Sequence, residues 1–363
     1  YLSARATDVA GNLSVVVNGD GVTIDLTAPA GTIVNDGTGD DIAYTGSDST
    51  LSAVWPAFTE TVSGISKYEY AIGSSSGGTN VVDWMGNATD TSFTKTGLST
   101  TSGTAYYISV KATDNAENES TTITSDGVIV DTGGPIAGTV FDGPGADIDW
   151  TNSTSSLTAT WSGFSDTLSG IQKYEYAIGN SSGGTDVVDW TNNSTDTSVT
   201  KAGLTLTNGT TYYLSIRAAD NVGNVSTIVT SDGITVDTDV PIISSVIEGS
   251  LTADMDYQNS DTTLIIVWTG SDTASGIAQY EYALGTASAD SNTVAWTNAG
   301  TATADTLTGL SLTEDSIYYL SARATDVAGN LSVVVSGDGV TIDLTAPAGT
   351  IVNDGTGDDI VYT

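Results

Sequence analysis

The sequence predicts an all-β protein built of tandem seven-stranded sandwiches in an extended array. Three observations lead to this fold class: positions recur every 106 residues, apolar and polar residues alternate with a period of two, and the composition suits strands and turns. Of 363 residues, 41 are glycine, and Thr, Ser, Asp and Asn fill the stretches between alternating segments. Long helices have little support in such a composition.

The repeat is regular in aromatic, acidic and proline positions alike. A step of 106 residues relates Tyr1, Tyr107, Tyr213 and Tyr319; Asp25, Asp131, Asp237 and Asp343; Pro29, Pro135, Pro241 and Pro347; and Trp84, Trp190 and Trp296. Residues 1–45 are identical to 319–363 at all but two positions, where Asn18 aligns with Ser336 and Ala43 aligns with Val361. The sequence therefore also repeats with a longer period, which is three units long.

These spacings divide the chain into whole and partial units. We expect a partial repeat with the last two strands at 1–26, complete repeats at 27–132, 133–238 and 239–344, and a partial repeat with the first strand at 345–363. We interpret the chain as a window cut from a longer tandem array. The linkers "LTAP", "TGGP" and "TDVP" are short and end in proline, which limits bending.

The repeat 27–132 contains short alternating segments bounded by Gly, Asn, Asp and Ser. We expect strand B at 50–58, C at 65–73, C′ at 81–86, E at 91–98, F at 105–114 and G at 126–132, with 134–143 opening the next repeat as strand A. The alternation turns these side chains inward: Leu51, Ala53 and Trp55 on B; Tyr68, Tyr70 and Ile72 on C; Tyr106, Ile108, Val110 and Ala112 on F. Glu69 points outward.

Three segments carry a family resemblance: "GTAYYISVKATDNAEN", "WSGFSDTLSGIQKYEYAIG" and "VDTGGP", each recurring in all three repeats. Through them the whole chain resembles the tandem fibronectin type III-like and bacterial Ig-like modules of large bacterial surface adhesins or extracellular filaments. The resemblance implies a β-sandwich fold and, from adhesin stalks, junctions stiffened by calcium. It says little about function, because such modules serve many roles. The Arg-Gly-Asp tripeptide of some members is absent.

Composition narrows the function classes. The 44 acidic residues against 8 basic ones give a formal net charge of −36, so nucleic acid is an unsuitable partner. The chain has no histidine and no cysteine, which removes the usual general base, thiolate ligands and disulfides. No recurring acid pair occupies a position that reads as a cleft, and we expect no enzyme. No run of about 18 apolar residues predicts a membrane span.

The strand order predicts that acids meet where one repeat joins the next. In this topology the B–C and F–G loops lie at the N-terminal end of a repeat, and strand G finishes at its C-terminal end. Each junction then gathers an Asp after strand G, an acid from the next B–C loop, and an Asp and an Asn from the next F–G loop. The three sets are Asp25, Glu60, Asp114 and Asn118; Asp131, Asp166, Asp220 and Asn224; Asp237, Asp272, Asp326 and Asn330.

These loops contain no basic residue, since Arg5, Lys111, Arg217 and Arg323 lie on the outward face of strand F. Like charges a few ångströms apart repel by roughly 1–4 kcal/mol per pair. A hard divalent cation relieves this repulsion, and Ca²⁺ takes oxygen ligands from carboxylates, amides and carbonyls. The sequence therefore predicts structural Ca²⁺ at each junction. Plain turn chemistry, in which Asp and Asn bond to the nearby backbone, remains the alternative.

A second acid-rich segment recurs between strands A and B, as "NDGTGDD" at 35–41, "FDGPGADID" at 141–149 and "IEGSLTADMD" at 247–256. Asp36, Asp40 and Asp41 could bind another cation. The spacing varies between repeats, however, and this variation favours turns.

The tryptophans and asparagines have structural interpretations. Trp55, Trp161 and Trp268 are expected in the core. Trp84, Trp190 and Trp296 on strand C′ are expected to cover a sheet edge or a neighbouring repeat, with stacking on sugars as the alternative. Asn87, Asn152, Asn193 and Asn208 lie in acceptor triplets for glycosylation, which also arise by chance in such a composition.

The favoured function is mechanical. We expect a segment of a long extracellular fibre or adhesin stalk on the cell surface, whose partners are the neighbouring repeats of the same chain. Each repeat should add about 35–45 Å, from strands of about seven to ten residues. Two alternatives remain: a module that binds a ligand or glycan, and a protein that assembles laterally into a sheath, bundle or surface layer. The surface ligand is not given by the sequence.

Overall fold

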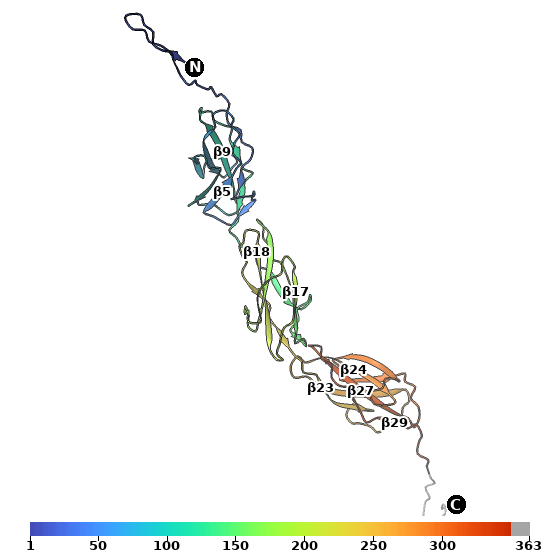
Figure 1. The fold of residues 1–363 in the computed structure, drawn as a ribbon. Coiled ribbons are helices and arrows are strands. Elements are labelled where there is room, and N and C mark those ends of the chain that lie inside the picture. The colour runs from blue at the N-terminus through green and yellow to red at the C-terminus, as the bar shows by residue number, and fades with distance from the viewer. Residues whose placement is uncertain (350–363) are drawn as a thin grey trace, which may run out of the picture.

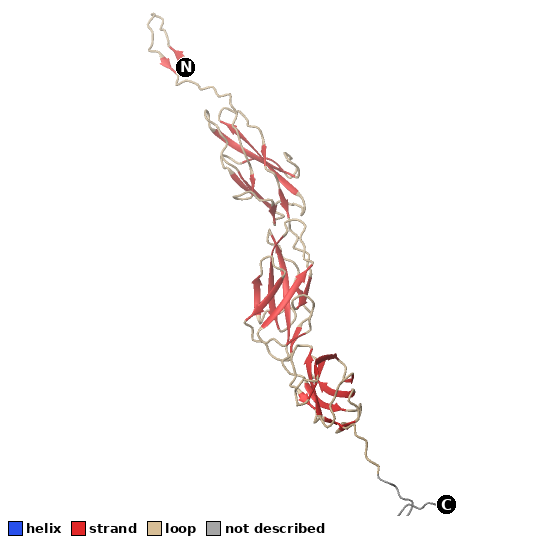
Figure 2. Cartoon of the chain, turned by 90° about the vertical axis from the view of Figure 1, so that its right-hand side faces the viewer, coloured by secondary structure: helices blue, strands red, loops and turns tan. Residues whose placement is uncertain are grey.

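The computed structural model describes residues 1–349, and every regular element in that range is a β-strand (Figure 2). Three sandwiches follow one another end to end, with a two-stranded hairpin ahead of the first (Figure 1). The expected all-β fold of tandem sandwiches is confirmed. The partial repeat expected at 345–363 falls largely outside the described residues, because 350–363 are not described. Within the described range, no helix is long and apolar enough to cross a bilayer.

The first sandwich shows the arrangement. One sheet, the ABE sheet, has the order β3 (Asn35–Asp36), β5 (Thr50–Val54), β8 (Ser92–Thr96). The other, the CFG sheet, has the order β4 (Tyr44–Thr45), β11 (Val128–Val130), β9 (Ala105–Asp114), β6 (Ile65–Gly73), β7 (Val82–Gly86), and β10 (Ile123–Thr124) also pairs with β9. This division of strands between two sheets is that of a fibronectin type III-like sandwich.

The other two sandwiches repeat the order. The second has β12 (Thr139–Asp142), β14 (Ser156–Ser162) and β17 (Ser198–Ala202) facing β13 (Trp150–Thr151), β20 (Ile234–Val236), β18 (Thr211–Asp220), β15 (Ile171–Gly179) and β16 (Val188–Asn192), with β19 (Val229–Thr230) on β18. The third has β21 (Ile242–Glu248), β23 (Thr263–Ser271) and β26 (Ala304–Thr308) facing β22 (Tyr257–Gln258), β29 (Val340–Ile342), β27 (Ile317–Asp326), β24 (Ile277–Gly285) and β25 (Val294–Gly300), with β28 (Val335–Ser336) on β27.

The hairpin ahead of the first sandwich pairs β1 (Ser3–Ala4) with β2 (Val17–Asn18) in the register Ser3↔Asn18. The complete sandwiches pair F and G in the same register, as Ser109↔Thr124 shows. The hairpin in residues 1–26 therefore has the register of strands F and G in a complete sandwich.

Strands A and G differ from the expectation, because each is split. After β3 the chain leaves the ABE sheet, crosses to the CFG sheet through residues 37–43, and pairs in parallel with strand G at Tyr44↔Ile129. Strand G breaks between β10 and β11 at Ser125, Asp126 and Gly127, and Gly127 takes a φ of +103°. The acid-rich segment at 35–41 is thus a crossover between sheets rather than a simple A–B turn. Two-residue strands give no periodicity that a sequence could reveal.

The core lies between the two sheets and contains the residues that the alternation turned inward. Trp55, Trp161 and Trp268 are 2%, 3% and 0% exposed, which confirms them as core residues. In the first sandwich the Trp55 ring meets Tyr68 edge-on, with ring centroids 5.7 Å apart. Each sandwich has its own cluster of buried apolar side chains, so each closes its own core.

The outward face of the CFG sheet holds the second set of tryptophans. The Arg217 guanidinium lies 4.3 Å from the centroid of the Trp190 ring and its Nε donates to Glu175 at 2.8 Å. The same stack joins Lys111 with Trp84, and Arg323 with Trp296. These half-buried rings cover their own sheet, as the structural interpretation predicted. The basic side chains of strand F are therefore engaged away from the junctions.

Candidate metal centres at the junctions

The linkers leave little free chain between sandwiches. After β11 the chain runs through Thr132, Gly133, Gly134 and the buried Pro135, and then pairs at once with the second sandwich. Ile136 N donates to Ser165 O at 2.7 Å, and Ser165 N donates back to Ile136 O at 3.1 Å. The first linker is tied in the same way by Ala30 and Thr59. Each strand G end is therefore held close to the next B–C loop.

The aspartate after strand G reaches across this junction. Asp131 Oδ1 accepts from Gly133 N at 3.2 Å, whereas Oδ2 accepts from Ser169 N, in the next B–C loop, at 3.1 Å. The other junctions repeat the second bond, from Ser63 N to Asp25 and from Ser275 N to Asp237. The carboxylate of one sandwich thus helps to shape a loop of the next.

The two loop acids help to fold their own loops. Asp166 Oδ1 accepts from Leu168 N and Gly170 N at 3.1 and 2.7 Å. Asp220 Oδ1 accepts from Val222 N and Asn224 N at 3.0 and 2.8 Å. The turn chemistry left open by the sequence is therefore present; it uses one oxygen of Asp166, whereas both oxygens of Asp220 accept hydrogen bonds within the loop.

The acids of each junction lie close to one another. At each junction, one oxygen from each of three carboxylates lies within 4.8 Å of the other two; the triplets are Asp25, Glu60 and Asp114; Asp131, Asp166 and Asp220; and Asp237, Asp272 and Asp326. Two oxygens bound to one Ca²⁺ at about 2.3–2.6 Å can be at most about 5 Å apart. The spacing therefore fits a shared cation. We call these triplets the junction carboxylates.

The junction carboxylates carry buried charge without a basic partner. Asp114, Asp131, Asp220, Asp237 and Asp326 are each at most 1% exposed. Hydrogen bonds from Ser63 and Thr27 lower the pKa of Asp25 to about 2. Burial acts to raise the pKa of Asp114, but hydrogen bonds from Asn118 and Ala116 outweigh it and hold the pKa below its ordinary value. All salt bridges among the described residues lie elsewhere, around strands C and F.

The asparagines predicted as ligands also make hydrogen bonds that span the junction. Asn224 Nδ2 donates to Asp131 O across the junction at 2.9 Å and to Asp220 Oδ2 at 2.8 Å. Asn118 and Asn330 make the equivalent bonds to Asp25 O and Asp237 O. An amide NH₂ offers no lone pair to a cation. In this arrangement Asn118, Asn224 and Asn330 clamp the junction through their Nδ2 groups, so only their amide oxygens could serve as the predicted ligands.

Asn224→Ala should loosen the second junction selectively. It removes a hydrogen bond that spans two sandwiches and one to a carboxylate, a loss of roughly 1 kcal/mol in the local opening free energy. Amide hydrogen exchange in residues 220–226 should accelerate about fivefold. Asn180→Ala serves as the control, because Asn180 is exposed and its side chain makes no hydrogen bond among the described residues. Equal exchange in both variants would contradict the clamp.

A second acidic cluster lies within each sandwich and was only half visible in the sequence. One carboxylate oxygen each from Asp36, Asp41 and Asp126 lies within 4.8 Å of the others, and Asp142, Asp147 and Asp232 repeat the set. We call these the crossover clusters. Sequence reasoning named Asp36 and Asp41 but missed Asp126, whose signal was the recurring Ser-Asp-Gly at 125–127 and 231–233. Asp40 lies outside the cluster.

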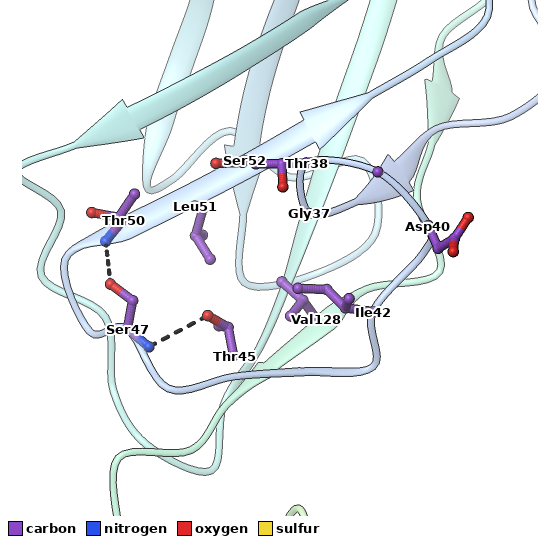
Figure 3. A pocket seen from close by; sticks show the side chains of 11 residues that line it. Gly37, Thr38, Asp40, Ile42, Thr45, Ser47, Thr50, Leu51, Ser52 and Val128 are labelled. Carbon is purple, nitrogen blue, oxygen red and sulfur yellow. Dashed lines mark hydrogen bonds between the residues drawn. The ribbon is translucent and has the colours of Figure 1, made fainter. Parts of the chain in front are cut away.

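A pocket of about 480 Å³ lies beside the same crossover in the first sandwich (Figure 3). Leu51, Ile42 and Val128 point into it, and Ser47 bonds Thr45 and Thr50 along its rim. The equivalent pocket in the second sandwich measures about 120 Å³. Asp40 is the only titratable side chain that lines the first pocket, so its walls offer no set of groups for acid–base chemistry.

No family model matches the chain. Among curated proteins it is similar to Exoglucanase B of Cellulomonas fimi, with 30% identity over 270 residues, or 71% of this chain. The match spans only 22% of the length of that exoglucanase.

Two solved structures of fibronectin type III modules are similar to the chain. The FN1–FN3 domains of chicken CNTN1 match 86% of it and 98% of their own chain at 15% identity and a TM-score of 0.35. The fibronectin(III)-like modules of Clostridium thermocellum CbhA match 56% of it and 94% of their own chain at 16% identity and a TM-score of 0.31. The strand order described above, rather than these alignments, identifies the fold.

Proposed function

We propose that this chain is a non-catalytic, load-bearing segment of an extracellular protein, in which Ca²⁺ bound by the junction carboxylates stiffens a row of sandwiches. The observation that carries the proposal is the convergence of three acids from two successive sandwiches at each junction. Buried carboxylates without a basic partner repel one another, and a hard cation turns that repulsion into a bond between sandwiches. Short linkers and the Asn clamps already limit the range of bending.

In this proposal the segment serves as a spacer, and two kinds of extracellular protein could contain it. A fibre or adhesin stalk on a bacterial surface agrees with the tandem repeats and with the near-identity of residues 1–45 and 319–363, three repeats apart. The similarity to part of Exoglucanase B favours a second setting, a spacer between the working domains of a secreted polysaccharide-degrading enzyme. Sequencing the complete gene distinguishes them, because a glycanase domain in the same chain selects the second and a long run of further repeats selects the first.

Chelation should make the array more flexible. We expect small-angle scattering to give a longer maximum dimension in millimolar calcium than in chelator, because each cation fixes the angle between two sandwiches. Melting should also move to higher temperature with calcium, since the ion binds only the folded junction. Thermal scans alone would not separate the junctions from other sites, so the scattering difference is the decisive measurement.

The matched variant changes one junction only. Asp166→Asn keeps the side-chain shape and, because Asp166 makes no bond to Asn224, the Asn224 clamp, while it removes one negative charge. In calcium, the distance distribution between spin labels placed on the first and second sandwiches should broaden in this variant and stay narrow in the parent. The same labels on the second and third sandwiches are the control. If calcium leaves the parent's scattering and label distances unchanged, the stiffening role is wrong.

A further inference from the structure

The crossover cluster lies where strand A leaves the ABE sheet and strand G breaks. Asp36, the last residue of β3, is 0% exposed. Its Oδ2 accepts from Gly127 N at 3.1 Å, and its own N–H donates to Asp41 Oδ1 at 2.7 Å. Its Oδ1 is buried and makes no hydrogen bond among the described residues. A buried carboxylate oxygen without a partner therefore belongs to a group that includes two further acids.

The second sandwich repeats this arrangement residue for residue. Asp142 is 0% exposed, Gly233 N donates to its Oδ2 at 3.0 Å, and its Oδ1 is again buried without a partner. Asp142 N donates to Asp147 Oδ1 at 2.9 Å. The exposed Asp232 completes the group.

The third sandwich reaches the same arrangement with different residues. Glu248 replaces the aspartate, is 0% exposed, and has an unpartnered buried Oε2. Its N–H donates to Asp254 Oδ1 at 3.0 Å, and Asp254 and Asp338 act electrostatically on its carboxyl group. Gly337 stands where the other sandwiches have Ser125 and Ser231.

The longer acid and the glycine compensate for each other. Ser125 Oγ accepts from Ile108 N at 3.0 Å, and Ser231 Oγ accepts from Leu214 N at 3.0 Å. In the third sandwich Glu248 Oε1 accepts the equivalent bond, from Leu320 N at 2.9 Å. A Cβ on Gly337 would overlap the Glu248 carboxylate. In the third sandwich the acid is therefore one methylene longer and the serine hydroxyl is absent. A buried carboxylate with one unpartnered oxygen is nevertheless present in all three sandwiches.

A neutral side chain could accept the same hydrogen bonds from the backbone N–H groups. These hydrogen bonds therefore do not explain why all three sandwiches have an acidic residue at this buried position. Burying an ionised carboxylate is costly unless a positive species accompanies it. No lysine or arginine ion pair involves these acids among the described residues. The positive species is therefore either a proton or a metal cation. A proton needs only one carboxylate, whereas a cation needs several oxygen ligands, so the two further acids at the same point favour the cation.

We propose that each crossover cluster is a second divalent-cation site, of the hard, oxygen-liganded class that Ca²⁺ represents, internal to one sandwich and separate from the junctions. The ligands are Asp36, Asp41 and Asp126 in the first sandwich and Asp142, Asp147 and Asp232 in the second. In the third they are Glu248 with Asp254 and Asp338, the two acids that act electrostatically on it. The ion pins the crossover of strand A to the break in strand G. It thereby holds the two sheets of a sandwich together at the edge where strand A crosses from one to the other.

The test uses the full chain with its junction sites disabled. Asp25→Asn, Asp131→Asn and Asp237→Asn together remove the carboxylate that spans each junction and leave every crossover acid intact. Calorimetric titration with CaCl₂ at about pH 8 should still show one ion bound per sandwich. Terbium should bind in their place with tyrosine-sensitised emission, because the Tyr107 ring packs against Gly127, with 2.7 Å from its nearest atom to a Cβ built there.

Two further variants locate the binding. Added to the junction-disabled chain, Asp36→Asn, Asp142→Asn and Glu248→Gln should abolish the remaining calcium uptake and terbium emission. Asp126→Asn, Asp232→Asn and Asp338→Asn should weaken uptake at least tenfold; these residues are exposed, so this variant keeps the test valid if the buried substitutions prevent folding.

Calcium uptake that vanishes in the junction-disabled chain, or that survives both sets of crossover substitutions, overturns the proposal. In the first case the buried acid is simply protonated. If calcium leaves the scattering of the parent chain unchanged but still binds at the crossover clusters, only the stiffening role of the junctions is refuted. The junction proposal and the crossover proposal can therefore fail independently.

Discussion

Glu248→Asp and Gly337→Ser should each destabilise the third sandwich, and together they should restore it. Gly337→Ser places a Cβ and hydroxyl against the Glu248 carboxylate, an overpacking cost of about 1–3 kcal/mol. Glu248→Asp withdraws the acceptor from Leu320 N and leaves a buried donor unsatisfied, at about 1–3 kcal/mol. The pair recreates the Asp142 and Ser231 arrangement of the second sandwich.

The coupling free energy of this cycle should be about 2–3 kcal/mol, near the upper range for contacting residues. Hydrogen exchange of β27 amides measures it, because exchange reports the third sandwich separately from the other two. The reciprocal exchange in the first sandwich, Asp36→Glu with Ser125→Gly, is the matched control and should couple with the same sign. Additive single effects would show that the acid and the small residue do not share one space.

The stability of the calcium-free chain should rise as the pH falls from about 8 to about 5, and calcium should reverse that trend. Burial raises the pKa of Asp36 to about 7, against the opposing effects of the nearby Ser125 hydroxyl and of the hydrogen bond from Gly127 N. Burial likewise raises the pKa of Asp142 to about 6 and that of Glu248 to about 7. Nearby Asp41 and Asp126 raise the Asp36 value further.

The direction follows from which state binds more protons. A carboxyl whose folded pKa lies above its unfolded pKa is protonated preferentially in the folded state between the two values. Its contribution is therefore full below about pH 4 and is lost as the pH rises through about 7. At about 1.4 kcal/mol per pKa unit, each sandwich gains roughly 1–3 kcal/mol when the pH falls from about 8 to about 5. Asp25, whose pKa is lowered to about 2, opposes this only below about pH 4.

Calcium competes with the proton for these carboxylates, so its stabilising effect should be large at about pH 8 and small at about pH 5. Thermal unfolding followed by circular dichroism in chelator and in millimolar calcium, across this range, gives the four curves needed. The chain with Asp36→Asn, Asp142→Asn and Glu248→Gln should lose the pH dependence in chelator. A parent chain that is equally stable at both pH values without calcium would remove the basis for this prediction.

The regular strands and the junctions could be read from the sequence because both depend on chain order. Alternation placed Leu51, Tyr70 and Ile108 inside, and the order of loops alone predicted that Asp131, Asp166 and Asp220 would meet. What those acids bind is a chemical question that their order does not answer. The role of Asn224 depends on which end of its amide faces the junction, and a sequence contains no such information.

The crossover cluster was underestimated for a physical reason. Its acids come from two chain segments about 90 residues apart, and the elements beside it, β3 and β4, are two residues long in the first sandwich. The irregular spacing of the acid-rich segments suggested turns. In the structure, Asp254 sits one position later than its counterparts Asp41 and Asp147, yet it accepts the same backbone bond. An insertion in the loop thus conceals a contact that the fold preserves.

Every junction reuses the same bonds, such as the one from Ser169 N to Asp131 and from Ser275 N to Asp237. Applying one fixed rotation and translation over and over generates a helix, whatever the rotation is. An array of such repeats should therefore trace a regular spiral, on which the Trp190 stack and its copies recur at constant angular intervals. The twist per repeat, once a single junction angle is known, would set the pitch of such an array.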